Sequence, residues 1–435
     1  MKILLVGGGG REHAIAWKLA QSPRVAEIVC APGNAGTQGA PGAPGGASKL
    51  RNAAVGAEDI PALVALAEAE RPDLCVVGPE VPLALGLTDA LTARGIRVFG
   101  PNRKCAQLEA SKSFTKAFLA RHGIPTAGYK EYTDLASLKA DIGVFGFPMV
   151  LKADGLAAGK GVLIAQTREE AERAAEELMG ARAFGEAGDK VVVEEFLRGT
   201  EASMLCFVDG SAIVPMESAQ DYKRIYDEDK GPNTGGMGTY SPSLLFAGGT
   251  GMMQRVYDEI LLPTLEGFRK DGLDFRGVLF VGLMLGKDGP KVIEFNNRFG
   301  DPETQAVLPR LKTDLLEILL AATEDRLAQK EIEWADDRKT VCVVMAAGGY
   351  PGSYSKGDAI CGLEQVPGDI LVFHAGTKAG EGGQTLTNGG RVLGVVGSGA
   401  THEEARARAY AGVACIRFDG AYCRSDIGIV YNTEG

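Results

Sequence analysis

The sequence predicts an α/β fold with an N-terminal doubly wound parallel sheet domain, an inserted α+β module and a C-terminal mostly β domain. Over roughly the first hundred residues, short apolar strands alternate with helices, which is typical of a parallel sheet covered by helices. From about 126 to 193, short strands and a charged helix surround a glycine-rich loop. The final hundred residues alternate strands with glycine-rich turns. We therefore expect domains at 1–105, 106–328 and 329–435, with the inserted module at about 126–193.

The individual elements follow from apolar periodicity and from the glycines and prolines that interrupt it. Strands are expected at 1–6, 28–31, 74–77, 97–99, 150–152, 161–165, 191–194, 277–285, 290–297 and 340–346. Helices are expected at 12–20, 60–70, 107–122, 168–178, 251–269, 313–328 and 402–413.

Composition indicates a globular protein of about three domains, since the chain has 435 residues, 45% of them hydrophobic and 23% charged. A formal charge of −10 argues against a nucleic-acid partner. The eight cysteines show no C-x-x-C pair and read as free thiols of a reducing compartment, so we expect a cytoplasmic protein. No apolar run is long enough for a bilayer, and we expect no membrane partner and a monomer.

The stretch from Val292 to Gln305 is the most informative part of the chain. It starts as an apolar strand, and alternation along a strand puts Glu294, Asn296 and Arg298 on one face. A carboxylate and an amide oxygen suit Mg²⁺, while an arginine offers a planar fork to a carboxylate or phosphate. A solvated edge strand is the alternative, but the pattern favours a metal–phosphate site.

A glycine-rich turn, Gly7 to Gly10, follows the first strand and opens a helix, so its N–H groups could hold a phosphate. A dinucleotide site would need an acid at the end of the second strand, and Cys30–Asn34 contains none. A monophosphate cradle and a simple tight turn both remain open.

A second glycine-rich segment, Lys152 to Gly161, lies between two strands and lacks the Walker pattern. A Gly/Ala hairpin with lysines at both ends could close over a triphosphate. An ordinary exposed hairpin is the weaker alternative.

Acidic and basic residues near the next strands are less specific. The backbone of Glu194, Glu195, Phe196 and Leu197 could pair with an adenine edge, and Glu201 could reach ribose hydroxyls. Asp221 to Arg224 could suit an amino acid, although a solvated charged loop is the favoured interpretation of these residues on their own. The four histidines form no zinc or triad pattern.

Taken together, these motifs resemble the phosphoribosylamine–glycine ligase family of the ATP-grasp superfamily over essentially the whole chain. The resemblance rests on Gly9–His13, Val77–Glu80, Ser111–Lys112, Lys152–Gly161, Gly231–Gly238 and Arg298–Glu303. It implies an ATP-grasp fold whose inserted module is a lid. It also implies ATP-dependent ligation of glycine to 5-phosphoribosylamine through glycyl phosphate, in purine biosynthesis.

The resemblance also implies a role for each matching residue, with ATP as co-substrate and Mg²⁺ or Mn²⁺ as the metal. Arg298 and Lys152 would be catalytic, and Glu294 and Asn296 would hold the metal. ATP would contact Lys112, Lys152, Gly159, Lys160, Gly161, Glu194, Glu195, Phe196, Leu197 and Glu201. The substrates would contact Gly8, Gly9, Gly10, Glu80, Asp221, Lys223 and Arg298. We further expect Lys152 and Lys160 to be unheld before nucleotide binds.

Two departures from the family pattern stand out. Residues 278–285 carry no acid, so the protein offers few metal ligands, and the first turn has only glycines where a polar residue is expected. Three other functions compete: another ATP-grasp carboxylate–amine ligase or carboxylase, a nucleotide-binding regulator and a dinucleotide-dependent oxidoreductase.

Overall fold

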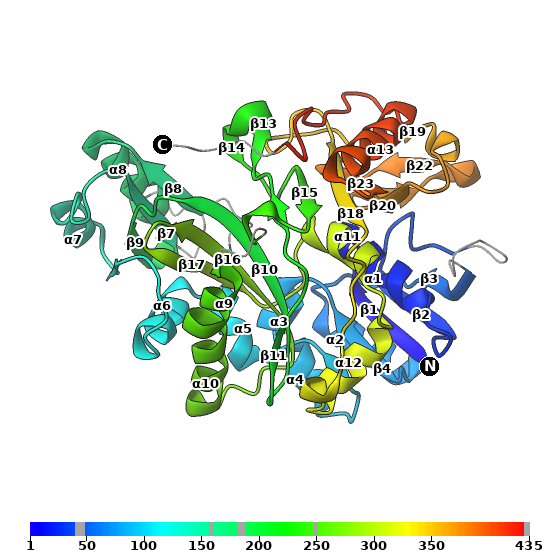
Figure 1. Ribbon diagram of the computed structural model, residues 1–435, viewed down its shortest axis with the longest axis horizontal. Coiled ribbons are helices and arrows are strands. Elements are labelled where there is room, and N and C mark those ends of the chain that lie inside the picture. Colours follow the sequence, from blue (N-terminus) through cyan, green and yellow to red (C-terminus); the bar gives the residue numbers. More distant parts are fainter. Residues whose placement is uncertain (40–47, 157–160, 181–187, 247–250, 430–435) are drawn as a thin grey trace.

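The computed structural model describes residues 1–39, 48–156, 161–180, 188–246 and 251–429. Figure 1 shows an N-terminal layer in blue beside a C-terminal layer in orange and red. A central green sheet joins them to a projecting module that carries α7 and α8.

The N-terminal domain is a parallel sheet of order β3-β2-β1-β4-β5, which confirms the predicted doubly wound arrangement. Its strands are β1 (Lys2–Gly7), β2 (Glu27–Pro32), β3 (Leu50–Asn52), β4 (Leu74–Val77) and β5 (Val98–Phe99). Its helices are α1 (Gly10–Ala20), α2 (Ile60–Glu70), α3 (Glu80–Ala84) and α4 (Leu87–Thr92). Because parallel strands end at one edge, the glycine turn after β1 and the loop before Glu80 lie side by side, with Gly78 N donating to Val6 O at 3.0 Å.

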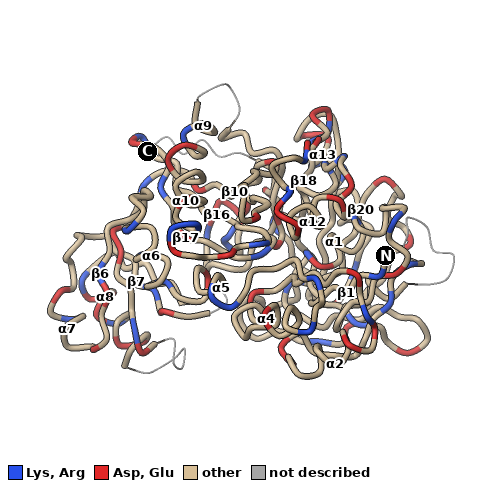
Figure 2. The backbone as a smooth tube through the Cα atoms, turned by 90° about the horizontal axis from the view of Figure 1, so that it is seen from below, with Lys and Arg blue, Asp and Glu red and all other residues tan. Residues whose placement is uncertain are grey.

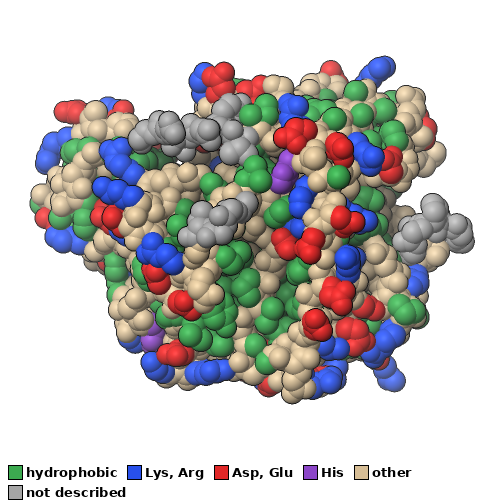
Figure 3. All heavy atoms as spheres, viewed as in Figure 1, with side chains coloured by type: hydrophobic (Ala, Val, Ile, Leu, Met, Phe, Trp, Pro, Cys, Tyr) green, Lys and Arg blue, Asp and Glu red, His purple; other side chains and the backbone are tan. Residues whose placement is uncertain are grey.

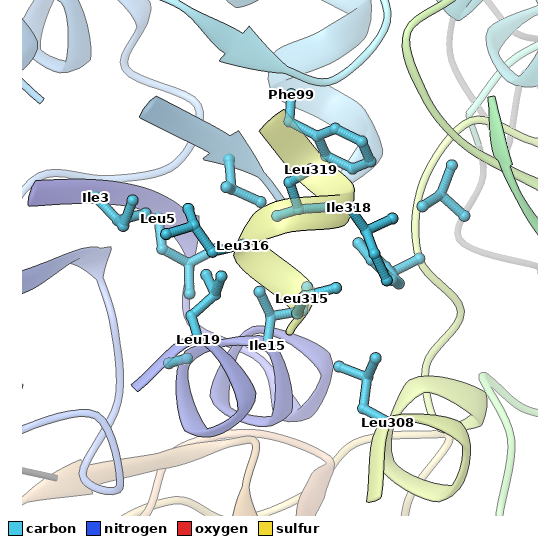
Figure 4. Close-up of a cluster of buried hydrophobic side chains, with 14 of the residues drawn as sticks. Ile3, Leu5, Ile15, Leu19, Phe99, Leu308, Leu315, Leu316, Ile318 and Leu319 are labelled. Atoms are coloured by element: carbon cyan, nitrogen blue, oxygen red, sulfur yellow. The ribbon is translucent and has the colours of Figure 1, made fainter. Parts of the chain in front are cut away.

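One face of this sheet is covered by α1 and by a helix from much later in the chain, α12 (Leu315–Thr323). Leu315, Leu316 and Leu319 point into the cluster formed with Ile3, Leu5 and Ile15 (Figure 4). The helix expected at 313–328 is longer than the observed one, which ends at Thr323. Asp325, two residues later, adopts a left-handed φ of 54°, which a helix cannot continue through. Burial of this leucine-rich helix fixes the N-terminal sheet to the rest of the molecule.

The expected helix at 107–122 is wrong, because the segment forms two helices, α5 (Arg103–Ala110) and α6 (Lys112–Arg121). Ser111 is extended, with φ −131° and ψ 116°, and its Oγ accepts the Phe114 N–H at 3.1 Å. A serine that caps the second helix breaks the first one.

The inserted module, which we call the lid module, is an antiparallel sheet of order β6-β9-β7-β8. Its strands are β6 (Tyr129–Tyr132), β7 (Met149–Ala153), β8 (Val162–Ala165) and β9 (Val191–Glu195). The helices α7 (Leu135–Ala140) and α8 (Arg168–Ala175), with a π-helical turn at Glu176–Gly180, share a separate core with it.

The central sheet is also antiparallel, with order β11-β10-β16-β17. It comprises β10 (Thr200–Val208), β11 (Ile213–Pro215), β16 (Gly277–Gly286) and β17 (Gly289–Asn296). Where one helix was expected at 251–269, α9 (Met252–Val256) and α10 (Leu262–Asp271) are joined by a π-helical turn, Tyr257–Leu261.

The C-terminal part is mostly antiparallel β, as predicted, but its main sheet takes strands from the middle of the chain. The order β12-β15-β18-β23-β20 places β15 beside β18, with Gly238 opposite Val343. These strands are β12 (Gln220–Asp221), β15 (Gly238–Ser241), β18 (Lys339–Ala346), β20 (Leu371–His374) and β23 (Arg391–Gly399).

Smaller elements complete the fold. They are the pair β13 (Arg224–Tyr226) and β14 (Lys230–Asn233), the sheet β19 (Ala359–Ile360), β22 (Thr385–Thr387) and β21 (Thr377–Ala379), and the helices α11 (Glu303–Val307) and α13 (His402–Cys415). Among the described residues, no helix combines the length and the hydropathy needed to cross a membrane. Acidic and basic side chains are interspersed over the face shown in Figure 3.

Candidate active site

The centre of the candidate site is the end of β17, where Glu294, Asn296 and Arg298 form a chain of polar contacts. Asn296 Nδ2 lies 3.4 Å from Glu294 Oε1, and Arg298 donates to Asn296 Oδ1 at 3.3 Å. These contacts place the three predicted residues together.

The residue opposite Glu294 on the neighbouring strand is Gly282, not an acid. A Cβ at Gly282 would stand 3.2 Å from Glu294 Cγ, so the glycine lets the carboxylate lie close to the sheet. Within the described ranges, no group of three or more His, Cys, Asp or Glu residues could hold a metal ion. Carboxylate and amide oxygens at this strand end nevertheless suit Mg²⁺ with water or phosphate as further ligands.

Three lysines from distant parts of the chain act on Glu294. Burial would raise the pKa of its carboxyl, but Lys223, Lys112 and Lys152 hold that pKa below its ordinary value. Basic and acidic segments accordingly mix around β17 in Figure 2. Such a cluster of cations beside a carboxylate is suited to a polyphosphate with a divalent metal.

Lys152 is held by a buried ion pair, so the expectation that its side chain is unheld is wrong. Its side chain is buried and its Nζ lies 2.9 Å from Glu194 Oε1 on the adjacent strand. Glu194 Oε2 binds a second lysine, Lys116, at 3.0 Å, and Lys116 also donates to Thr126 Oγ1 at 2.8 Å. A buried carboxylate needs such partners, and here it takes two.

Lys116 was not predicted as a site residue, although its spacing of four from Lys112 puts both on one helix. Burial lowers the pKa of Lys116 to about 8. The backbone of Glu194 lies inside the sheet between β6 and β7, and Glu195 N donates to Gly128 O at 3.0 Å. Phe196 and Leu197 follow the end of the strand.

The glycine-rich loop of the lid module is anchored to the N-terminus of α6. Asp154 accepts the Ser111 hydroxyl at 3.0 Å and the Ser113 N–H at 3.1 Å, on either side of Lys112. Ala153 N donates to Gly161 O at 2.8 Å and so closes the arms of the hairpin. The predicted contacts Gly159 and Lys160 lie outside the described residues.

A second group of charges is centred on residues 201–221 and Glu303. Lys223 and Glu201 form an ion pair at 2.6 Å, so two residues predicted for different ligands bind each other. Ser203 Oγ lies 3.3 Å from Asp221 Oδ1 and 3.4 Å from Glu303 Oε1, and thus bridges two carboxylates. Burial and the neighbouring Asp221 raise the pKa of Glu303 to about 7.

Arg298 lies between two further carboxylates. Its Nη2 is 3.2 Å from Glu109 Oε1 and its Nε is 3.5 Å from Glu80 Oε2, with the guanidinium over the Phe280 ring. Burial would raise the pKa of Glu80, but Arg11 and Arg298 hold it below its ordinary value. The predicted Glu80 and Arg298 therefore meet, and Glu109 is a neighbour that the motifs did not reveal.

Close packing explains why the first turn contains only glycines. A Cβ on Gly8 would stand 2.5 Å from Gly33 O, and one on Gly10 would stand 2.5 Å from Gln305 Nε2. The Gly9 N–H already donates to Glu12 Oε2 at 2.6 Å. The turn at Gly8, Gly9 and Gly10 thus lies against the residues that follow Arg298.

Arg391, from β23, ties the C-terminal sheet to these loops. Its Nη1 donates to Asp301 O at 2.7 Å and to Gly235 O at 2.6 Å. The glycine loop at 231–238 and the turn at 300–302 are therefore fixed by one guanidinium. No motif pointed to this residue.

Comparison with known proteins decides the family. Three profiles cover nearly the whole chain: the N domain of phosphoribosylglycinamide synthetase matches residues 1–109, its ATP-grasp (A) domain 110–304 and its C domain 340–430. The chain belongs to the phosphoribosylglycinamide synthetase family. It is 52% identical over 431 residues to the phosphoribosylamine–glycine ligase of Escherichia coli (strain K12), covering 98% of both chains. It is 51% identical over 430 residues to that of Vibrio vulnificus (strain YJ016), again covering 98% of both.

Solved structures agree with this assignment to the phosphoribosylglycinamide synthetase family. The phosphoribosylamine–glycine ligase of Thermotoga maritima is similar with a TM-score of 0.84 at 33% identity, over 98% of this chain and 100% of that one. The biotin carboxylase domain of the Hydrogenobacter thermophilus 2-oxoglutarate carboxylase gives a TM-score of 0.73 at 17% identity, over 97% of this chain and 91% of that one, and so shares the fold. The predicted ATP-grasp fold is confirmed.

Proposed function

We propose that the protein ligates glycine to 5-phosphoribosylamine, giving glycinamide ribonucleotide, ADP and phosphate in purine biosynthesis. The observation that carries this is the clustering of Glu294, Asn296 and Arg298 amid three lysines, in a chain related to phosphoribosylamine–glycine ligases along nearly its whole length. Two rivals, a dinucleotide-dependent oxidoreductase and a mere regulator, explain neither feature.

The reaction proceeds through an acyl phosphate. The glycine carboxylate attacks the γ-phosphate of ATP, which breaks the bond to the β-phosphate oxygen and releases ADP. The amine of 5-phosphoribosylamine then attacks the carbonyl of glycyl phosphate, and phosphate leaves. This chemistry depends on positioning and charge neutralisation rather than on a nucleophilic side chain.

The family resemblance, with the contacts of the described residues beside it, supports a role for each site residue. Mg²⁺, or Mn²⁺, held by Glu294 and Asn296 would neutralise charge on the phosphates. For ATP we propose Lys112, Lys152, Gly159, Lys160 and Gly161 at the phosphates, Glu194, Glu195, Phe196 and Leu197 at adenine, and Glu201 at ribose. For the substrates we propose Gly8, Gly9, Gly10 and Glu80 at phosphoribosylamine, and Asp221, Lys223 and Arg298 at glycine. Arg298 and Lys152 act in catalysis.

We also propose that the units 1–105, 106–328 and 329–435 are the domains, with the lid module at about 126–193.

Free thiols at every cysteine support a cytoplasmic, reducing location. We propose that the protein is a monomer, which sedimentation would test.

An ADP-release assay tests the function. With Mg²⁺, ATP and 5-phosphoribosylamine generated in place, ADP should form only when glycine is present, together with glycinamide ribonucleotide. Glycine-independent ADP release, or equal turnover with bicarbonate in place of glycine, would assign the site to another ATP-grasp reaction.

A further inference from the structure

Glu109 lies at the junction of the candidate ATP and glycine sites, and no motif or comparison assigns it a role. It is buried near the end of α5, with 6% of its surface exposed. Its Oε2 accepts the Asn297 N–H at 2.7 Å, and its Oε1 lies 3.2 Å from Arg298 Nη2. Its backbone carbonyl lies 3.5 Å from the Lys112 Nζ.

The local fold explains how one residue reaches both sites. The break at Ser111 ends α5 just after Glu109 and starts α6 at Lys112. The side chains of Glu109 and Lys112 can therefore point in different directions. The end of β17 is also fastened to α5 at a second point, since Asn297 Nδ2 donates to Cys105 O at 3.1 Å. Residues 297 and 298 therefore have a defined position relative to α5.

The guanidinium of Arg298 has competing partners. Glu80 is 3.5 Å from its Nε, and the Phe299 carbonyl accepts from its Nη1 at 3.3 Å. A long arginine side chain loses rotamer entropy when it is fixed. A charged partner at Nη2 fixes the orientation of the guanidinium in advance. A carboxylate ligand then binds an arginine that is already oriented.

We propose that Glu109 is a positioning residue for glycine, which rests on the proposed function. Its carboxylate fixes the plane of the Arg298 guanidinium, while its carbonyl sets the place of Lys112 at the phosphates. The glycine carboxylate and the γ-phosphate are thereby held at a constant separation, as an in-line attack requires. Glu109 itself touches neither substrate.

Glu109→Gln tests this role, because the amide oxygen can still accept from the Asn297 N–H while the negative charge that faces Arg298 is lost. The KM for glycine should rise about tenfold or more, with the KM for ATP within about twofold of wild type. Glu68→Gln is the matched control, since Glu68 pairs with Arg94 at 2.7 Å on the surface of α2, and it should change neither constant.

A double-mutant cycle separates positioning from simple stability. If Glu109 acts through Arg298, adding Glu109→Gln to Arg298→Lys should raise the glycine KM little beyond Arg298→Lys alone. If Glu109→Gln lacks the wild-type melting transition, Glu109→Asp replaces it in the same measurements. The aspartate keeps the charge but places the carboxylate further from Arg298.

Two results would overturn the role of Glu109. One is an unchanged glycine KM, and the other is an equal rise for glycine and ATP with additive effects in the cycle. Wild-type protein whose ADP release ignores glycine would instead overturn the proposed function, so the two failures are distinguishable.

Discussion

The Asp154 carboxylate accepts a hydrogen bond from the Ser111 hydroxyl at 3.0 Å, which fastens the lid module to the helix that carries Lys112. A carboxylate at a helix N-terminus is favoured by the exposed N–H groups there, and the Ser113 N–H adds a second bond at 3.1 Å. The two lysines proposed for the phosphates therefore sit on elements that are joined to each other.

The first prediction concerns this junction. Asp154→Ala should speed hydrogen exchange at residues 153–156 about tenfold without nucleotide, because two hydrogen bonds to α6 are lost. In wild type, ATP with Mg²⁺ should slow exchange in the same segment. Asp369→Ala, which removes a surface partner of Arg408, serves as control. Equal exchange in the wild type and Asp154→Ala would show that the contact does not hold the loop.

The second prediction concerns the metal. Glu294→Gln should fold normally but lower kcat at least a hundredfold, since loss of one such electrostatic group costs on the order of 3 kcal/mol in the barrier. Steady-state assays across a Mg²⁺ titration measure this, with the exposed Glu266→Gln as control. Near wild-type turnover at saturating Mg²⁺ would remove Glu294 from the metal site.

The third prediction concerns glycine. Arg298→Lys should raise the KM for glycine far more than that for ATP, because lysine cannot make a bidentate pair with a carboxylate. Initial rates with each substrate varied in turn give both constants. An equal rise for ATP would make Arg298 a phosphate ligand and shift the glycine site towards Asp221 and Lys223.

The fourth prediction concerns pH. The pKa of Glu303 rises from 4.5 to about 7 on folding, so between these values the folded protein binds more protons than the unfolded chain. This contribution makes the free energy of unfolding fall as pH rises from 4.5 towards 7. Glu303→Gln should therefore lose less stability than wild type between about pH 5 and about pH 8, each pKa unit being worth about 1.4 kcal/mol.

Urea denaturation at the two pH values measures this difference. The exposed Glu58→Gln should follow wild type. If wild type and Glu303→Gln lose equal stability across the range, Glu303 titrates near its ordinary pKa in the folded protein.

Features that depend on local pattern could be predicted from the sequence. Apolar periodicity placed α2 at 60–70 and β4 at 74–77, and alternation along β17 brought Glu294 and Asn296 to one face. The break at Ser111 was missed because a capping serine inside a helical pattern has the same periodicity as a continuous helix.

Contacts between distant segments could not be predicted. The pairing of Glu194 with both Lys116 and Lys152 joins α6 to two strands of the lid module, and no spacing in the chain encodes it. Arg391 binds Asp301 and Gly235, which are 90 and 156 residues away in the chain, and a lone arginine before an apolar run carries no signal.

The pairing of β15 with β18 bears on any attempt to divide this protein into fragments. A fragment that began at residue 329 would keep β18, β23 and β20 but lose the strand that covers one side of β18. The sequence of β18, KTVCVVMA, would then present an unprotected, strongly β-forming edge. Recombinant pieces cut at that point should therefore precipitate, and soluble production of the C-terminal part requires that residues 218–242 be supplied in trans or retained on the same chain.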